Sequence, residues 1–177
     1  MPTLFLDRDG VLNVRRPSDY IKSVQDFLPS PGLEEAMRLL ASAFGRIVVV
    51  TNQAGIGKGI MSELELGSIH QKMIQMVQAA QGRIDQVYFC PHRSNEGCTC
   101  RKPATGMAWK ALADFPDIDF EDAWMVGDSA SDMAFGQSLG MRTVLITGKI
   151  EDIAALSVLP IHHRFDSLLA FARWYSA

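Results

Sequence analysis

Residues 4–13, LFLDRDGVLN, decide the fold class that we expect of this chain. The three apolar residues at its start predict a short buried strand. The strand ends at two carboxylates, Asp7 and Asp9, and Gly10 lets the backbone turn sharply behind them. Two like charges at the end of a buried strand repel each other and lose hydration. A magnesium ion relieves both costs, whereas an ordinary strand end with solvated acids needs no cation.

Downstream of this stretch, segments that predict strands alternate with segments that predict helices. Residues 47–50 are apolar without alternation, as expected for a strand that is buried on both faces of a parallel sheet. Further strands are expected at residues 84–89, 123–126 and 142–146. The sequence therefore predicts about five strands.

The helices are expected where capping residues precede an apolar stripe. Ser30 is expected to cap a helix that has Pro31 at its first position. Ser62 and Glu65 predict a capping box for a helix that reaches about residue 80. Further helices are expected at residues 106–113, from Asp128 and Ser129 to Gly140, near Asp152, and from Asp166.

Alternating strands and helices imply right-handed crossovers and a doubly wound parallel α/β sheet. Five strand–helix units use most of the 177 residues, which leaves no room for a large cap domain. We therefore expect one domain spanning residues 1–177.

Composition and charge exclude several classes of function. The formal net charge of −3 gives nonspecific nucleic-acid binding no electrostatic support. No apolar run approaches the roughly 20 residues of a membrane span. The chain starts directly on its first strand, which leaves no room for a signal peptide. We expect a monomeric cytoplasmic protein that binds neither nucleic acid nor membrane.

Polar residues follow each predicted strand. In a doubly wound sheet the carboxyl ends of the strands meet at one edge, where ligands bind. Each group taken alone has an ordinary explanation: a glycine-rich connection after Gln53, a solvated lysine at position 102, or acids favoured by a helix dipole. Their convergence on one edge predicts a binding site made of Asp7, Asp9, Thr51, Asn52, Gln53, Lys102, Asp128 and Asp132.

The three cysteines lie within eleven residues, together with one histidine. An odd and clustered set does not resemble a secreted disulfide framework and indicates metal binding in a reducing compartment. Reduced cysteines beside a surface histidine would be the alternative. Three thiols and one imidazole match a closed structural zinc site formed by Cys90, His92, Cys98 and Cys100.

Four segments resemble the ordered motifs of the haloacid dehalogenase superfamily. They are LDRDGV at residues 6–11, VVTNQ at 49–53, RKP at 101–103 and VGDSASD at 126–132. The resemblance covers roughly residues 4–146. Within the superfamily the chain resembles the small, nearly capless branch of heptose bisphosphate phosphatases and histidinol phosphatases, which shares the zinc loop.

The resemblance implies a magnesium-dependent phosphomonoesterase that forms an aspartyl-phosphate. Asp7 would be the nucleophile, and Asp9 would protonate the leaving alkoxide and then activate water. Magnesium would lie between Asp7, the backbone carbonyl of Asp9 and Asp128, with Asp132 behind them or acting through water. The substrate would be bound by Thr51, Asn52, Gln53, Arg101 and Lys102.

Two substrate classes compete within this branch. The short metal loop and residues 17–19 favour histidinol phosphate, whereas residues 53–56 with Gly59, and residues 105–107, favour a heptose. Ser129 departs from both, because a basic residue is common at that position.

The charge at the rim of the expected site favours the heptose. Arg101 can bind a second anionic group, and Arg15 and Arg16 either face the same rim or are solvated. Such a rim attracts a bisphosphate and disfavours the cationic amine of histidinol phosphate. We expect heptose 1,7-bisphosphate, with histidinol phosphate as the alternative.

A catalytically silent module that binds a phosphorylated ligand would be the alternative from another class. It would need a lost catalytic group, yet Asp7, Asp9, Lys102 and Asp128 are all present. The remaining histidines fit no site and are expected on the surface or in packing roles: His70, His162 and His163.

Overall fold

The computed structural model describes residues 1–16, 18–148 and 153–177. Its centre is a parallel sheet with the strand order β3-β2-β1-β4-β5-β6. The chain fills the sheet outward from β1 in one direction and then resumes from β4 in the other, so the topological switch point lies between β1 and β4. The strands are β1 (Thr3–Leu6), β2 (Arg46–Asn52), β3 (Gln86–Cys90), β4 (Trp124–Gly127), β5 (Arg142–Ile146) and β6 (His163–Phe165).

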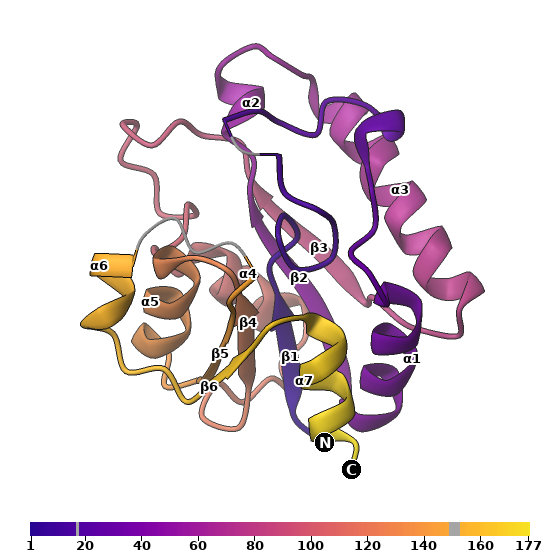
Figure 1. Ribbon diagram of the computed structural model, residues 1–177. Helices are drawn as coiled ribbons and strands as arrows, with labels where there is room; N and C mark the ends of the chain where they lie inside the picture. The colour runs from indigo at the N-terminus through magenta and orange to yellow at the C-terminus, as the bar shows by residue number, and fades with distance from the viewer. Residues whose placement is uncertain (17, 149–152) are drawn as a thin grey trace.

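Helices cover both faces of the sheet, as Figure 1 shows. One face carries α1 (Leu33–Ala43), α3 (Glu63–Ala79) and α7 (Leu168–Tyr175), and the other carries α4 (Gly106–Asp114), α5 (Ala130–Ser138) and α6 (Ile153–Ser157). The short α2 (Ala54–Gly57) lies beyond the end of β2, and a 3-10 helix, η1 (Val24–Asp26), lies between β1 and α1. The predicted doubly wound α/β fold is confirmed.

The two faces of β1 supply two separate halves of the core. Leu4 and Leu6 pack into the cluster with α1, α3 and α7, whereas Phe5 packs into the cluster with α4 and α5. All three side chains are fully buried. Successive residues of a strand point to opposite faces, so a strand covered on both faces has no polar alternation. This is why the apolar run at residues 4–6 predicts the middle of the sheet.

The predicted strands agree with the structure to within two residues at each end, but β6 was not predicted. It consists of three residues, His163–Phe165, and pairs in parallel with β5 at the sheet edge. Its side chains are half-buried or exposed, so it lacks an apolar pattern. The last helix begins at Leu168, after Ser167 caps it. Residue 17 and the predicted helix start at Asp152 lie outside the described residues.

The predicted capping signals are right for two helices and wrong for one. The Ser62 and Glu65 capping box opens α3, and Ser129 opens α5. The prediction that Ser30 caps α1 is wrong, because the N-cap is Gly32 in the left-handed region, with φ 75°. The backbone N–H of Ser30 instead donates to the carbonyl of Leu12, which ties the start of α1 to the loop after β1.

Among the residues that the structure describes, no helix has both the length and the apolar character that crossing a membrane requires.

Candidate active site

A cleft of about 400 Å³ opens at the carboxyl ends of the central strands, next to the switch point. Its floor is formed by the end of β2, by the loops after β1 and β4, and by Lys102 from the loop after β3; the rest of that loop supplies one wall. The side chains at the floor are polar, although three of the four residues of β1 and all four residues of β4 are apolar. The floor residues are Asp7, Asp9, Thr51, Asn52, Lys102 and Asp128.

Three carboxylates and one ammonium group form the centre of the cleft. The carboxylate oxygens of Asp7, Asp128 and Asp132 lie within 4.8 Å of one another. The Nζ of Lys102 lies 2.8 Å from Asp7 Oδ1 and 2.6 Å from Asp132 Oδ1. All four side chains are buried. The cluster therefore carries more negative than positive charge in a place where water screens it poorly.

The pKa values report this imbalance. Burial and then the Asp132 carboxylate raise the pKa of Asp7 to about 7. Burial and then the Asp7 carboxylate raise the pKa of Asp128 to about 8. Burial alone would lower the pKa of Lys102, but the carboxylates of Asp132 and Asp7 raise it above its ordinary value. An additional cation would stabilise the ionised carboxylates, and a donor set made of oxygen suits magnesium.

Gly10 leaves the space that the Asp128 carboxylate occupies. Gly10 has φ +94°, and a Cβ atom built on it would lie 1.9 Å from Asp128 Oδ2. Only a residue without a side chain lets the turn after β1 approach the β4 loop so closely. The Asp-x-Asp-Gly motif thus needs its glycine for the acidic cluster as well as for the turn.

We expect Gly10→Ala to lower the apparent magnesium affinity at least tenfold, because the methyl group must displace Asp128. Unfolding should also become easier by about 1–2 kcal/mol from backbone strain. Gly140→Ala is the matched control, since Gly140 has φ +74° but its nearest neighbour to a Cβ lies at 3.8 Å. Magnesium titration followed by thermal unfolding measures both effects. Equal magnesium affinity in the two variants would contradict the role of Gly10.

Asp9 is held by donors on both carboxylate oxygens. Arg8 Nη2 lies 2.9 Å from each oxygen, Asn13 Nδ2 lies 3.0 Å from Oδ1, and Gln53 Nε2 lies 2.9 Å from Oδ2. Burial by itself would raise the pKa of Asp9, but the Arg8 guanidinium and these hydrogen bonds hold it below its ordinary value. The Asp9 side chain remains 27% exposed and faces the cleft, so it can reach a bound ligand.

Two residues expected to contact substrate hold other site residues in place. The buried Gln53 side chain donates to Asp9 and, at 2.9 Å, to Thr51 Oγ1. The Asn52 amide accepts from the backbone N–H of Lys102 at 2.9 Å and donates to the Lys102 carbonyl at 3.1 Å. Asn52 and Thr51 also line the cleft. These bonds join the end of β2 to the loop after β1 and to the loop that carries Lys102.

Basic residues line the rim. The Nη1 atom of Arg101 is buried without a hydrogen-bond partner among the residues that the structure describes. Arg16 is different, because its Nη1 lies 3.0 Å from Asp26. Arg15 Nη1 lies 3.4 Å from Asp128 Oδ2. Lys58, which the sequence did not single out, also lines the cleft.

Arg8 and His70 lie behind the acids and were not identified from the sequence. Arg8 is fully buried, and its Nη1 lies 3.2 Å from His70 Nε2 on α3. Burial and then the Arg8 charge lower the pKa of His70 to about 3, so the ring is neutral. The other two histidines pack as predicted: His162 Nδ1 accepts from Thr143, and the His163 ring stacks on Trp124.

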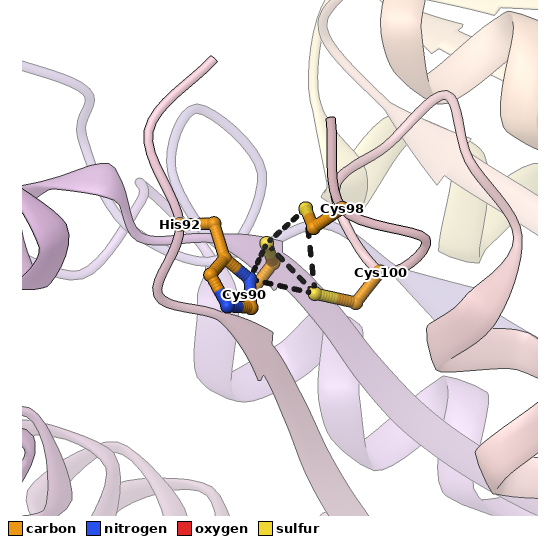
Figure 2. Close-up of side chains that lie close together, drawn as sticks. All are labelled: Cys90, His92, Cys98 and Cys100. Atoms are coloured by element: carbon orange, nitrogen blue, oxygen red, sulfur yellow. Dashed lines mark hydrogen bonds between the residues drawn. The ribbon is translucent and has the colours of Figure 1, made fainter. Parts of the chain in front are cut away.

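The loop after β3 brings three thiols and one imidazole together, and Figure 2 shows them converging. Cys90 Sγ lies 3.0 Å from Cys100 Sγ and 3.5 Å from Cys98 Sγ, and His92 Nδ1 lies 3.2 Å from Cys100 Sγ. In a tetrahedral site with Zn–S bonds of about 2.3 Å, two sulfurs lie about 3.8 Å apart. The four donors therefore fit zinc in number, kind and approximate spacing.

The loop also contacts the α2 segment and carries two cleft residues. The backbone N–H of Gly57 donates to the Pro91 carbonyl at 2.9 Å, and Arg93 Nε donates to the Gly57 carbonyl at 2.7 Å. Arg101 and Lys102 directly follow the last thiol. The loop after β3 thus supports two walls of the cleft.

Comparison with known proteins agrees with this architecture. A family model described as HAD-hydrolase-like matches residues 99–170. D-glycero-beta-D-manno-heptose-1,7-bisphosphate 7-phosphatase of Pseudomonas putida is 37% identical over 174 residues, which are 98% of each chain. The protein of the same name in Neisseria meningitidis is 36% identical over 98% of this chain and 94% of that relative.

The crystal structure of D,D-heptose 1,7-bisphosphate phosphatase from B. bronchiseptica, complexed with magnesium and phosphate, superposes with a TM-score of 0.88. The sequences are 30% identical in that superposition, which covers 98% of this chain and 97% of the other. Because the matches cover nearly the whole of each chain, the similarity includes the whole sheet as well as the motifs. The chain therefore belongs to the haloacid dehalogenase superfamily, in the branch of the heptose bisphosphate phosphatases.

Proposed function

We propose that the protein is a magnesium-dependent phosphatase that removes the 7-phosphate of a heptose 1,7-bisphosphate through an aspartyl-phosphate. The observation that carries the proposal is the buried cluster in which Lys102 contacts both Asp7 and Asp132 beside Asp128, at the floor of an open cleft. The full-length relatives named above support the substrate, since their names specify this bisphosphate and position 7.

Asp7 is the nucleophile in this proposal, and Lys102 holds its carboxylate in place. The Lys102 ammonium contacts Asp7 Oδ1 and lies in reach of phosphoryl oxygens that arrive there. Asp7, the Asp9 carbonyl and Asp128 would hold magnesium, which supplies positive charge beside the phosphoryl oxygens. Asp132 anchors the arrangement, because it binds Lys102 and accepts from the backbone N–H of Asp128 at 3.1 Å.

Asp9 is the acid and base in this proposal. Its carboxyl transfers a proton to the leaving alkoxide and then takes one from the water that attacks the aspartyl-phosphate. The lowered pKa favours the ionised form, which can accept a proton in the second step but must first be protonated to act as the acid. The same lowered pKa makes Asp9 a strong acid once it is protonated, so the proton passes readily to an alkoxide.

Phosphate release from both anomers of heptose 1,7-bisphosphate, from histidinol phosphate and from p-nitrophenyl phosphate tests the assignment. Hydrolysis of the heptose bisphosphate should require magnesium and should exceed that of histidinol phosphate. A preference for histidinol phosphate would overturn the substrate assignment but leave the assignment as a phosphatase intact. Magnesium-independent binding without hydrolysis of any ester would favour the silent module instead.

Arg101 is proposed to bind the second phosphate of the substrate. Arg101 lines the cleft, and its buried Nη1 has no hydrogen-bond partner among the described residues, whereas the Arg16 guanidinium is paired with Asp26 at 3.0 Å. We expect Arg101→Ala to lower kcat/KM for the bisphosphate about 10–100-fold, because a hydrogen bond between charged groups contributes about 1.5–3 kcal/mol. A heptose 7-monophosphate should lose far less. Arg16→Ala is the matched control, and equal losses on both substrates in Arg101→Ala would refute this role.

We also propose that the Cys90, His92, Cys98 and Cys100 cluster holds a structural zinc ion. Four protein donors occupy all positions of a tetrahedral ion, so this zinc would take no part in the chemistry. Thiols that are kept available for a metal imply a reducing compartment, and on this ground we propose the cytoplasm. A monomer is proposed as well, because a single chain brings the nucleophile, the acid and the cationic residues to one cleft.

A further inference from the structure

Arg8 is a fully buried arginine whose guanidinium faces away from the cleft centre. Its neighbours Asp7 and Asp9 face the cleft, whereas Arg8 extends toward α3. A buried guanidinium needs partners for its donors, because an unpaired buried charge is strongly destabilising. Two partners are present: the Asp9 carboxylate, and the Nε2 atom of His70 at 3.2 Å.

The two partners bind different edges of the guanidinium. Nε and Nη2 bind Asp9 at 2.9–3.2 Å, and Nη1 binds His70. Arginine can only donate, so His70 Nε2 is the acceptor and the ring proton lies on Nδ1. A planar fork that is bound at both edges has a fixed orientation. His70 therefore fixes the plane in which Arg8 presents its hydrogen bonds to Asp9.

We propose that His70 and Arg8 are positioning residues that aim the Asp9 carboxyl at the leaving group. This role deepens the proposed function and rests on it. Asn13 and Gln53 hold the carboxylate from two other directions, and Arg8 supplies the bidentate contact. Neither His70 nor Arg8 lines the cleft, so they act through Asp9 rather than on the substrate.

The loss of activity expected from a change at His70 or Arg8 depends on the leaving group of the substrate. The alkoxide of a sugar leaves poorly unless it receives a proton, whereas nitrophenolate leaves readily without one. A displaced Asp9 carboxyl therefore slows phosphoryl transfer from the sugar ester but leaves transfer from p-nitrophenyl phosphate nearly unchanged. Because kcat/KM reports the steps up to the first phosphoryl transfer, the later role of Asp9 as a base does not obscure the comparison.

The experiment measures kcat/KM for heptose 1,7-bisphosphate and p-nitrophenyl phosphate in the full chain with magnesium. We expect His70→Leu to lower the value for the sugar ester about 10–100-fold, because small misplacements of a catalytic group cost that much. The value for the aryl ester should change by less than about threefold. His70→Gln should restore the sugar ester, because its amide oxygen can accept from Arg8.

Val77→Ala is the matched control for lost stability. Val77 is buried on the same helix, α3, and is not part of the Arg8 contact. This variant should unfold more easily with an unchanged ratio between the two esters. If His70→Leu does not fold, Arg8→Lys gives the same readout, since lysine keeps the charge and loses the fork.

Equal losses on both esters, or no loss on the sugar ester, would overturn the positioning role. Failure of the proposed function looks different, because the unaltered protein would then not hydrolyse the sugar ester in magnesium. A loss confined to the sugar ester and rescued by glutamine supports the role.

Discussion

Replacing Asp7 with asparagine is expected to lower kcat for phosphate release by about 10⁴-fold or more. The amide keeps the shape of the side chain but cannot form an aspartyl-phosphate. Lys102 keeps its 2.6 Å contact with Asp132, so the opposite wall of the cluster should stay in place. The result expected is a folded protein in which the chemistry is lost.

The stability of the same variant provides an internal check. Burial and neighbouring carboxylates raise the pKa of Asp7 to about 7, which means that the fold disfavours its ionised form. Above that pH without magnesium, ionised Asp7 costs stability, and an uncharged asparagine relieves the repulsion from Asp128 and Asp132. We therefore expect Asp7→Asn to unfold at the same temperature as the unaltered protein, or higher, in magnesium-free buffer.

Steady-state phosphate release and thermal unfolding measure the two outcomes. Asp122→Asn is the matched control, because Asp122 is an exposed partner of Arg142 at the opposite end of β4. It should leave kcat unchanged. Hydrolysis by Asp7→Asn near the unaltered rate would contradict the covalent mechanism, whatever the metal dependence.

Residue type and strand position were sufficient to predict the sheet and the edge that carries the site. Leu4 to Leu6 and Ile47 to Val50 are apolar on both faces, and such runs occur only where helices cover both sides. The acids after β1 and β4 then meet at the switch point, because parallel strands end at one edge. β6 escaped prediction because three half-exposed residues at an edge carry neither an apolar run nor an alternation.

The same reasoning could not tell which polar residue faces the ligand. Gln53 and Asn52 follow a strand end as Thr51 does, yet their amides bind Asp9 and the Lys102 backbone. His70 lies 62 positions from Arg8 along the chain, so only the packing of α3 brings the two together. One signal was available: a long charged side chain between two acids at the end of a buried strand needs a buried partner.

The rim likewise depends on contacts between distant segments. The sequence does not distinguish the three basic residues near the expected site, Arg15, Arg16 and Arg101. The structure separates them, because Arg16 is bound by Asp26, Arg15 approaches Asp128, and Arg101 keeps a buried donor without a partner among the described residues. Differences in neutralisation, rather than in residue type, make Arg101 the strongest candidate for a second phosphate.

Loss of the proposed zinc ion is expected to destabilise the loop that follows β3. The loop between β3 and α4 has no helix or strand of its own, and its four donors converge on one point. Binding of a structural zinc ion contributes directly to folding. The protein should therefore contain about one zinc ion per chain when purified under reducing conditions without chelator.

We expect Cys98→Ser to remove most of this zinc and to lower the unfolding free energy by about 2–5 kcal/mol. In a domain of this size, such a loss corresponds to a fall in Tm of about 5–15 °C. Asn95→Ser is the matched control, since Asn95 is an exposed residue of the same loop. It should keep both the zinc and the Tm. Absence of zinc from the unaltered protein by elemental analysis would refute the site.

Activity should fall in Cys98→Ser as well, although none of the four proposed zinc ligands lines the cleft. The loop carries Lys102 into contact with Asp7 and Asp132, and it braces Gly57 through Pro91 and Arg93. Loosening it frees the Lys102 ammonium from a fixed position, and misplacement of a catalytic group by about 1 Å costs about 10²-fold. We expect kcat to fall at least tenfold at a temperature where the variant is still folded. An unchanged kcat in zinc-free, folded protein would show that Asn52 alone holds the Lys102 backbone in place.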